Sequence, residues 1–313
     1  MEFELGPATR EAYGQTLVEL GSEMPNLYVL DADLSKSTMT HHFGKAFPDR
    51  FFNVGISEAN MVGMAAGIAA AGNVVFASSF ACFVMCKGFD QLRLAVDYSG
   101  ANVKIVGSHG GISIGEDGVS QMGHEDLGLA LSLPSFTVIL PCDEPSARKA
   151  VRAAAETEGP FYIRVGRPKA PIVYKEGCDF HVGRSIQLRD GRDLTIITNG
   201  LQVSESLIAA ESLSQKGIEA RVLDMHTVRP LDHDAVEQAA RETGRILVVE
   251  EHLVWTGLGA QVAMSAAERK PCKIAFHGLR QYAESGAPRA VLEKYGMTAP
   301  AIEKTAIELF KRD

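Results

Sequence analysis

Residues 108–126 are of types that could bind a ligand or move protons. The segment reads SHGGISIGEDGVSQMGHED and places five glycines, two histidines, four carboxylates and one glutamine within nineteen residues. Buried polar groups need hydrogen-bond partners, so an apolar core has no use for a set this dense. Glycines let a backbone approach a ligand closely and adopt positive φ. The alternative interpretation is a glycine-rich surface loop whose charges are solvated.

The chain before this segment favours a ligand site. The apolar run 103–107 precedes it, so we expect the loop to begin where a strand ends. In open α/β sheets, ligands bind at the carboxyl ends of the strands. The segment is therefore the first place to look for catalytic side chains.

Glu58 lies in the sequence GISEAN, directly after an expected short strand and in the first turn of an expected helix. A carboxylate there complements the helix dipole and contributes on the order of a few tenths of a kcal/mol. The same position at a strand–helix junction would let it hydrogen-bond a ligand. The segment alone leaves both interpretations open.

Two aromatic residues, Phe80 and Phe83, lie three positions apart in a helix expected over 80–96. This spacing places both rings on one helix face. Core packing is the usual role of such a pair. The alternative is an aromatic wall against a flat heterocycle.

Four more polar residues lie beside the ends of expected elements, although they are far apart in sequence. Several basic or polar side chains that converge on one point would form a phosphate clamp. The sequence by itself does not show that these four converge. They are Arg10, Ser37, His109 and Arg167.

Helical and strand-like segments alternate along the chain, which predicts an α/β fold with mostly parallel sheets flanked by helices. The alternation breaks near 168–191, where prolines and glycines interrupt the pattern, and then resumes. We therefore expect two α/β domains, residues 1–170 and 191–313, joined by a linker over 171–190. A length of 313 residues fits two domains.

Composition excludes several classes of protein. The chain has 46% hydrophobic and 22% charged residues and a net charge of −8, with no long basic run, so nucleic acid is not an expected partner. It has no apolar stretch long enough to span a membrane and no signal-peptide pattern, and its five cysteines fit a reduced cytoplasm. Cys82 and Cys86 fit buried thiols better than a metal pair, and no metal-ligand set is expected.

Together these features resemble the C-terminal half of transketolase. The resemblance covers nearly the whole chain, and several motifs in the right order are more specific than any one of them. The motifs are ATREAYG (8–14), GISEANMVGM (55–64), SFACF (79–83), FDQLR (89–93), SHGGISIGEDGVSQM (108–122), RVGRP (164–168) and VLDMHTVRPLD (222–232).

The resemblance implies a thiamine-diphosphate pyrimidine-binding domain followed by a transketolase C-terminal domain. Transketolases also have a first domain that binds the diphosphate and Mg²⁺, and its Gly-Asp-Gly signature is absent from this sequence. The chain therefore resembles the small subunit of a split transketolase. A separate N-terminal subunit would ligate the Mg²⁺, and an α₂β₂ assembly is expected.

The resemblance also assigns roles at the cofactor site. Glu58 matches the glutamate that hydrogen-bonds the aminopyrimidine of thiamine diphosphate. Phe80 and Phe83 match the aromatic wall of the aminopyrimidine pocket. Cys86 stands where the family often has an aromatic or basic residue.

On the substrate side, Arg10, Ser37, His109 and Arg167 match the residues that hold the phosphate of a sugar phosphate. Two further loop residues match catalytic positions. Asp117 matches an aspartate that binds a substrate hydroxyl. Gln121 stands where bacterial and yeast enzymes carry His and animal-type enzymes Gln. His124 has no role that the family assigns.

The implied reaction is the transfer of a two-carbon ketol unit from a ketose phosphate to an aldose phosphate. One alternative is the β subunit of a 2-oxo acid dehydrogenase E1 component, which has the same two-domain layout, and a weaker one is part of 1-deoxyxylulose-5-phosphate synthase. An alternative of another class is a non-catalytic regulatory or interaction partner. The sequence does not identify the sugars.

Overall fold

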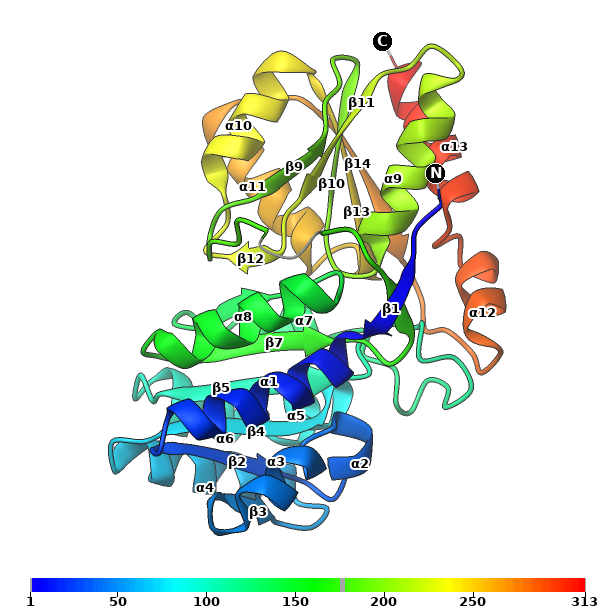
Figure 1. Ribbon diagram of the computed structural model, residues 1–313. Coiled ribbons are helices and arrows are strands. Elements are labelled where there is room, and N and C mark those ends of the chain that lie inside the picture. The colour runs from blue at the N-terminus through cyan, green and yellow to red at the C-terminus, as the bar shows by residue number, and fades with distance from the viewer. Residues whose placement is uncertain (1, 175–177, 313) are drawn as a thin grey trace.

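The computed structural model describes residues 2–174 and 178–312 as two α/β units, one stacked on the other (Figure 1). The first unit contains a seven-stranded sheet. Its neighbouring strands pair in parallel, except that β12 is antiparallel to β6. In spatial order the strands are β12 (Thr227–Arg229), β6 (Thr137–Ile139), β7 (Phe161–Val165), β5 (Val103–Ser108), β4 (Val74–Phe80), β2 (Leu27–Asp31) and β3 (Phe51–Asn53).

Helices cover both faces of this sheet because its strands are apolar on both faces. In β4, Val74 and Phe76 face helices α1 (Thr9–Glu23) and α8 (Glu144–Glu156), with Tyr13 and Val151 among the packed residues. The alternate residue, Val75, faces the opposite layer. That layer contains α4 (Glu58–Ala70) and α5 (Ala81–Lys87).

The second unit has a five-stranded sheet in which only β9 is antiparallel to its neighbour. Helices α9 (Gln202–Ser214) and α13 (Ala299–Phe310) pack on one face, and α10 (His233–Glu242) and α11 (Leu258–Arg269) pack on the other. In spatial order the strands are β14 (Lys273–Leu279), β13 (Arg245–Leu253), β10 (Leu194–Thr198), β11 (Ala220–Asp224) and β9 (Ile186–Arg189).

The two units are joined by more than the chain between them. Strand β12 follows β11 of the second sheet but completes the edge of the first sheet. Strand β1 (Leu5–Ala8) pairs with β8 (Lys169–Pro171). The segment 171–190, expected to be a linker, contains β9, because Ile186 and Leu188 pack on the core of the second unit. Residues 175–177 of that segment lie outside the described residues.

One expected helix differs from the structure. Instead of a helix over 80–96, strand β4 continues to Phe80, because its last residues pair with β5. The helix then breaks into α5, α6 (Phe89–Gln91) and a π-helical turn (Leu92–Asp97). Other elements were not expected from the sequence: the strands β1, β8, β9 and β12, the helices α2 (Ser35–Thr38), α3 (His41–Ala46), α7 (Asp126–Leu131), α12 (Pro288–Lys294) and α13, and a 3₁₀ turn (Pro48–Arg50). Among the described residues, we find no helix with the length and apolarity that a bilayer crossing requires.

Candidate functional site

The loop expected to carry chemistry leaves the carboxyl end of β5 and runs to the start of α7. Phe80 ends the neighbouring strand β4, and Arg167 follows β7 on the other side. Arg10 lies in the first turn of α1. The candidate residues therefore gather at the carboxyl ends of the strands of the first sheet. Parallel strands place all of these ends on the same side of a sheet.

Glu58 is the first residue of α4, and only 3% of it is exposed. The Ser79 hydroxyl donates a hydrogen bond to its carboxylate over 3.1 Å. The Lys87 ammonium lies 3.7 Å from the other carboxylate oxygen. The carboxylate is thus buried with few partners, and it retains lone pairs for a ligand.

The aromatic pair forms a stack with a histidine. The ring centroids of Phe80 and Phe83 are 5.4 Å apart, and those of Phe80 and His109 are 3.9 Å apart. Phe80 is buried, whereas Phe83 is partly exposed. The Lys87 ammonium lies 4.1 Å from the centroid of Phe83. Phe83 is therefore the more accessible of the two phenylalanines, with Lys87 over its ring, and Phe80 stacks with both Phe83 and His109.

His109 adopts a left-handed backbone with φ of 61°, which is rare for a residue with a side chain. Its Nδ1 lies 2.7 Å from the Ser108 hydroxyl, and the residue is buried. Burial first, then the charges of Arg10 and Arg167, lower the pKa of His109 to about 3. The imidazole is neutral at physiological pH and sits beside two guanidinium groups.

Arg10 and Arg167 both contribute to the positive environment of His109. Arg10 donates to the Ser37 carbonyl oxygen over 2.8 Å. Arg167 donates to the Ile114 carbonyl oxygen over 2.5 Å and forms an ion pair with Glu116 at 2.8 Å. Burial lowers the pKa of Arg10, and the charge of Arg167 contributes in the same direction. Each guanidinium group thus acts on the charge of the other, and an anion bound near both would be favoured.

Asp31 stabilises the turn that contains Ser37. Its buried carboxylate accepts hydrogen bonds from the Leu34 backbone N–H and from the hydroxyls of Thr38 and Thr40, over 2.6 to 2.9 Å. These bonds fold 34–40 into the turn that includes α2. The sequence reading missed Asp31, because its partners are backbone and hydroxyl groups that no motif reveals.

The remaining loop candidates have different environments. Asp117 is exposed, and its charge acts on Arg10. The Gln121 carbonyl oxygen accepts a hydrogen bond from the thiol of Cys82, on α5, over 3.2 Å. His124 is fully buried, and its Nε2 accepts a hydrogen bond from the Ala283 backbone N–H over 3.1 Å. These contacts give His124 a structural role between the two units.

A series of contacts runs from Glu58 through Lys87, Phe83 and Phe80 to His109, and the charges of Arg10 and Arg167 act on that histidine. Lys87 is the cofactor-side residue that the sequence reading missed. Its four-residue spacing from Phe83 on α5 was a usable signal, since such residues share a helix face. Its approach to Glu58 depends on tertiary packing. Cys86, which takes the family's aromatic or basic position, is exposed beside it.

Glu58 and Phe83 together offer a surface for an aminopyrimidine ring. Such a ring needs a polar group for its ring nitrogens and an apolar surface for its faces. Glu58 supplies a buried carboxyl group that can share a proton with a ring nitrogen, and Phe83 supplies a flat wall. The residues present fit the ring. Over 2–174 and 178–312, no group of three or more His, Cys, Asp or Glu side chains is arranged to hold a metal ion.

Comparisons with known proteins agree with this geometry. Residues 6–172 match the transketolase pyrimidine-binding domain, and residues 183–302 match the transketolase C-terminal domain. The chain belongs to the transketolase family. It is 40% identical to a putative transketolase C-terminal section of Methanocaldococcus jannaschii, over 97% of this chain and 96% of that protein. It is also 40% identical to human transketolase, over 94% of this chain and only 48% of the human protein.

Solved structures show the same relationship. A split-gene transketolase, solved as an inactive β₄ tetramer, is 43% identical with a TM-score of 0.91 and covers 97% of this chain and 99% of that one. Transketolase from Campylobacter jejuni has the same fold at 20% identity, with a TM-score of 0.84, over 96% of this chain and 46% of that one. The chain thus corresponds to the C-terminal half of a transketolase. Transketolases use thiamine diphosphate, and the pyrimidine-binding domain is part of that site.

Proposed function

We propose that this chain is the pyrimidine-binding subunit of a two-chain transketolase, which transfers a two-carbon ketol unit from a ketose phosphate to an aldose phosphate. The observation that carries the proposal is the series of contacts from Glu58 to His109, on which the charges of Arg10 and Arg167 act. It places a buried carboxylate and an aromatic face at the same end of the first sheet as two guanidinium groups.

On the cofactor side, the Glu58 carboxyl group would share a proton with a ring nitrogen of the aminopyrimidine. Phe83 would pack against the ring face, and Phe80 would fix the positions of Phe83 and His109. When bound, thiamine diphosphate supplies the electron sink for cleavage of the carbon–carbon bond. Lys87 would have to leave the Phe83 face for the ring to pack there.

On the substrate side, Arg10 and Arg167 would bind the sugar phosphate, together with Ser37 and the neutral imidazole of His109. Binding at a phosphate remote from the reacting carbons orients the carbonyl without taking part in bond cleavage. Asp117 would accept a hydrogen bond from a substrate hydroxyl, and Gln121 would contact the reacting carbons.

The proposed partner chain is supported by relatives that are themselves about as long as this chain. The diphosphate and Mg²⁺ would be bound by a separate N-terminal subunit, with two copies of each chain in the assembly. Two relatives of similar length are named as transketolase subunits. One acts on 6-deoxy-6-sulfo-D-fructose, comes from Clostridium sp. and is 38% identical over 97% of this chain and 94% of that protein. The other acts on apulose 4-phosphate, comes from Phocaeicola vulgatus and is 36% identical over 97% of this chain and 98% of that protein.

The test is to co-express this chain with the product of the neighbouring gene and to assay the pair with thiamine diphosphate, Mg²⁺, xylulose 5-phosphate and ribose 5-phosphate. We expect turnover only with both chains. Strong ketol transfer by the single chain would refute the two-chain arrangement. A panel that adds sulfofructose and apulose 4-phosphate as donors would identify the sugar.

The same preparation separates the alternatives. Turnover of pyruvate with an artificial electron acceptor, and none of any sugar phosphate, would favour a 2-oxo acid dehydrogenase. An associated pair that turns over neither class of substrate would favour a non-catalytic role.

A further inference from the structure

The active-site loop is a closed structure whose two ends meet. The Gly111 N–H donates to the Gly123 carbonyl oxygen over 3.0 Å, and Gly110 also bridges to Gly123. Between these ends lie Asp117 and Gln121. Because these ends are bonded to each other, we expect the loop to move as one body. The residues that hold its ends then determine where the side chains of Asp117 and Gln121 lie.

Glu251, on β13 of the second unit, holds the first end. One oxygen of its buried carboxylate accepts hydrogen bonds from the backbone N–H groups of Ile112 and Ser113, each over 2.6 Å. A Cβ at position 111 would lie 2.2 Å from the same oxygen, and the φ of Gly111 is +79°. The loop backbone thus rests directly on the carboxylate, which only glycine at position 111 permits.

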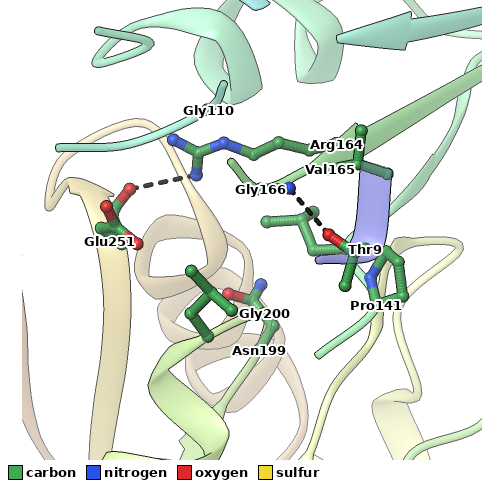
Figure 2. Close-up of a pocket in the computed structure, with 11 residues that line it drawn as sticks. Thr9, Gly110, Pro141, Arg164, Val165, Gly166, Asn199, Gly200 and Glu251 are labelled. Atoms are coloured by element: carbon green, nitrogen blue, oxygen red, sulfur yellow. Dashed lines mark hydrogen bonds between the residues drawn. The ribbon is translucent and has the colours of Figure 1, made fainter. Parts of the chain in front are cut away.

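Arg164, at the end of β7, holds the other end. It donates to the Gly123 carbonyl oxygen over 2.8 Å and to the Glu251 carbonyl oxygen over 3.0 Å. Its Nε lies 3.2 Å from the Asp126 carboxylate. In Figure 2, Arg164 and Glu251 reach toward each other across a small pocket between the units. One guanidinium group therefore connects the loop, the first sheet and β13.

The outer part of the loop also rests on the second unit. Ile114 and Met122 form a buried cluster with Leu279 and Val291. Positive-φ Gly115 packs so closely on Pro288 that a Cβ would lie 2.7 Å from its ring. The first unit supplies the catalytic side chains, whereas the second unit supplies the surface on which their loop lies.

We propose that Glu251 is a positioning residue for the reaction, through its two hydrogen bonds to the backbone at Ile112 and Ser113. In this role it would touch neither substrate nor cofactor. It would fix the position, relative to the second unit, of the loop that carries Asp117 and Gln121. The kinetic part of this inference rests on the proposed function, and the structural part does not.

The structural test is hydrogen exchange on the chain alone, comparing the 109–123 backbone with that of α11. Glu251→Asp keeps the charge beside Arg164 but shortens the side chain by one carbon–carbon bond, about 1.5 Å, so it cannot reach both N–H groups. We expect exchange of 109–123 to quicken by about tenfold or more, since two amides lose their acceptor. Glu251→Gln keeps the reach and should restore slow exchange.

Glu250 provides a matched control on the same strand. It is also buried, and its carboxylate accepts hydrogen bonds from the backbone N–H groups of Leu258 and Gly259, over 2.7 and 2.8 Å. Glu250→Asp should therefore quicken exchange in α11 and leave 109–123 unchanged. Equal effects of both substitutions on both segments, or no effect of Glu251→Asp on 109–123, would overturn the proposal.

The kinetic test uses the assembled two-chain enzyme. Glu251→Asp should lower kcat by about tenfold or more with a smaller change in KM, because the loop carries groups at the reacting carbons. Glu251→Gln should recover most of the rate, and Glu250→Asp should lose little. A normal kcat in a variant with fast loop exchange would refute the positioning role. If no substrate turns over even in the unaltered enzyme, the proposed function fails and the exchange result still stands.

Discussion

Substitution of Glu58 separates catalysis from folding. The change is Glu58→Gln, which keeps the volume of the side chain and its ability to accept a hydrogen bond from Ser79, but removes the carboxylate that would hold a proton at the aminopyrimidine. A positioned proton-transferring group contributes about 10²- to 10⁴-fold to a rate. We therefore expect turnover of the two-chain enzyme to fall by about 10²-fold or more.

The effect on stability should be small, because Glu58 has few partners. It accepts one hydrogen bond from a neutral hydroxyl, and the side chain of its ionic partner Lys87 is 49% exposed. Such an ion pair contributes about 0–1 kcal/mol. The helix dipole adds about 0.3–1 kcal/mol. The sum is roughly 0.3–2 kcal/mol, or at most a few degrees in Tm.

The assay combines steady-state kinetics of the assembled enzyme with thermal unfolding of the single chain. Glu144→Gln is the control, because Glu144 is likewise the first residue of a 13-residue helix. It should keep its activity within about twofold, as surface substitutions usually do. The reasoning about Glu58 fails if Glu58→Gln retains more than about a tenth of normal turnover, or if its activity falls only in step with its folded fraction.

Three further predictions concern the phosphate site and the second unit. Arg167→Ala should raise KM for phosphorylated sugars by about tenfold with little change in kcat, since a charged hydrogen bond is lost at a remote group; an unchanged KM would remove Arg167 from the clamp. By NMR, the ring of His109 should stay neutral down to about pH 4, because its pKa is lowered to about 3; a midpoint near 6.5 would contradict this. Burial raises the pKa of Asp224, which accepts a hydrogen bond from Tyr174 over 2.7 Å, to about 7. The pKa of Asp224 is therefore higher in the folded chain than in the unfolded chain. The stability that Asp224 contributes is full below about pH 3.8 and is lost as the pH rises to about 7. The stability of Asp224→Asn relative to the unaltered chain should therefore increase over that range by up to about 4 kcal/mol, as denaturant unfolding at several pH values would show; a constant difference would refute it.

The sequence predicted where strands β5 and β7 end, because polar residues followed each apolar run. In a parallel sheet such residues collect at the carboxyl ends of the strands. The apolar run before His109 proved to be strand β5, and the apolar run before Arg167 proved to be strand β7, so the candidate loop and Arg167 both follow strand ends as expected. Phe80 was assigned to a helix because its aromatic spacing fits one. Its pairing with Ser108 of β5 holds it in a strand instead.

What the sequence did not reveal depends on contacts between distant segments. Glu251 lies 139 residues from Ile112, and nothing in its own segment indicates that it binds a loop of the other unit. Strand β12 has only three residues and pairs with β6 far earlier in the chain. Periodicity reports on local structure, so such partners emerge only when the whole chain is folded.

Strand β12 follows β11 of the second unit in the chain but pairs with β6 of the first sheet. This arrangement limits where a gene for this chain could be divided. A break near residue 180 would leave the first sheet without its edge strand and would expose the backbone groups of β6, which are prone to pair with other chains. It would also remove Glu251 and the surface beneath the catalytic loop. We therefore expect the two units to be encoded together in one chain, although each has a sheet of its own.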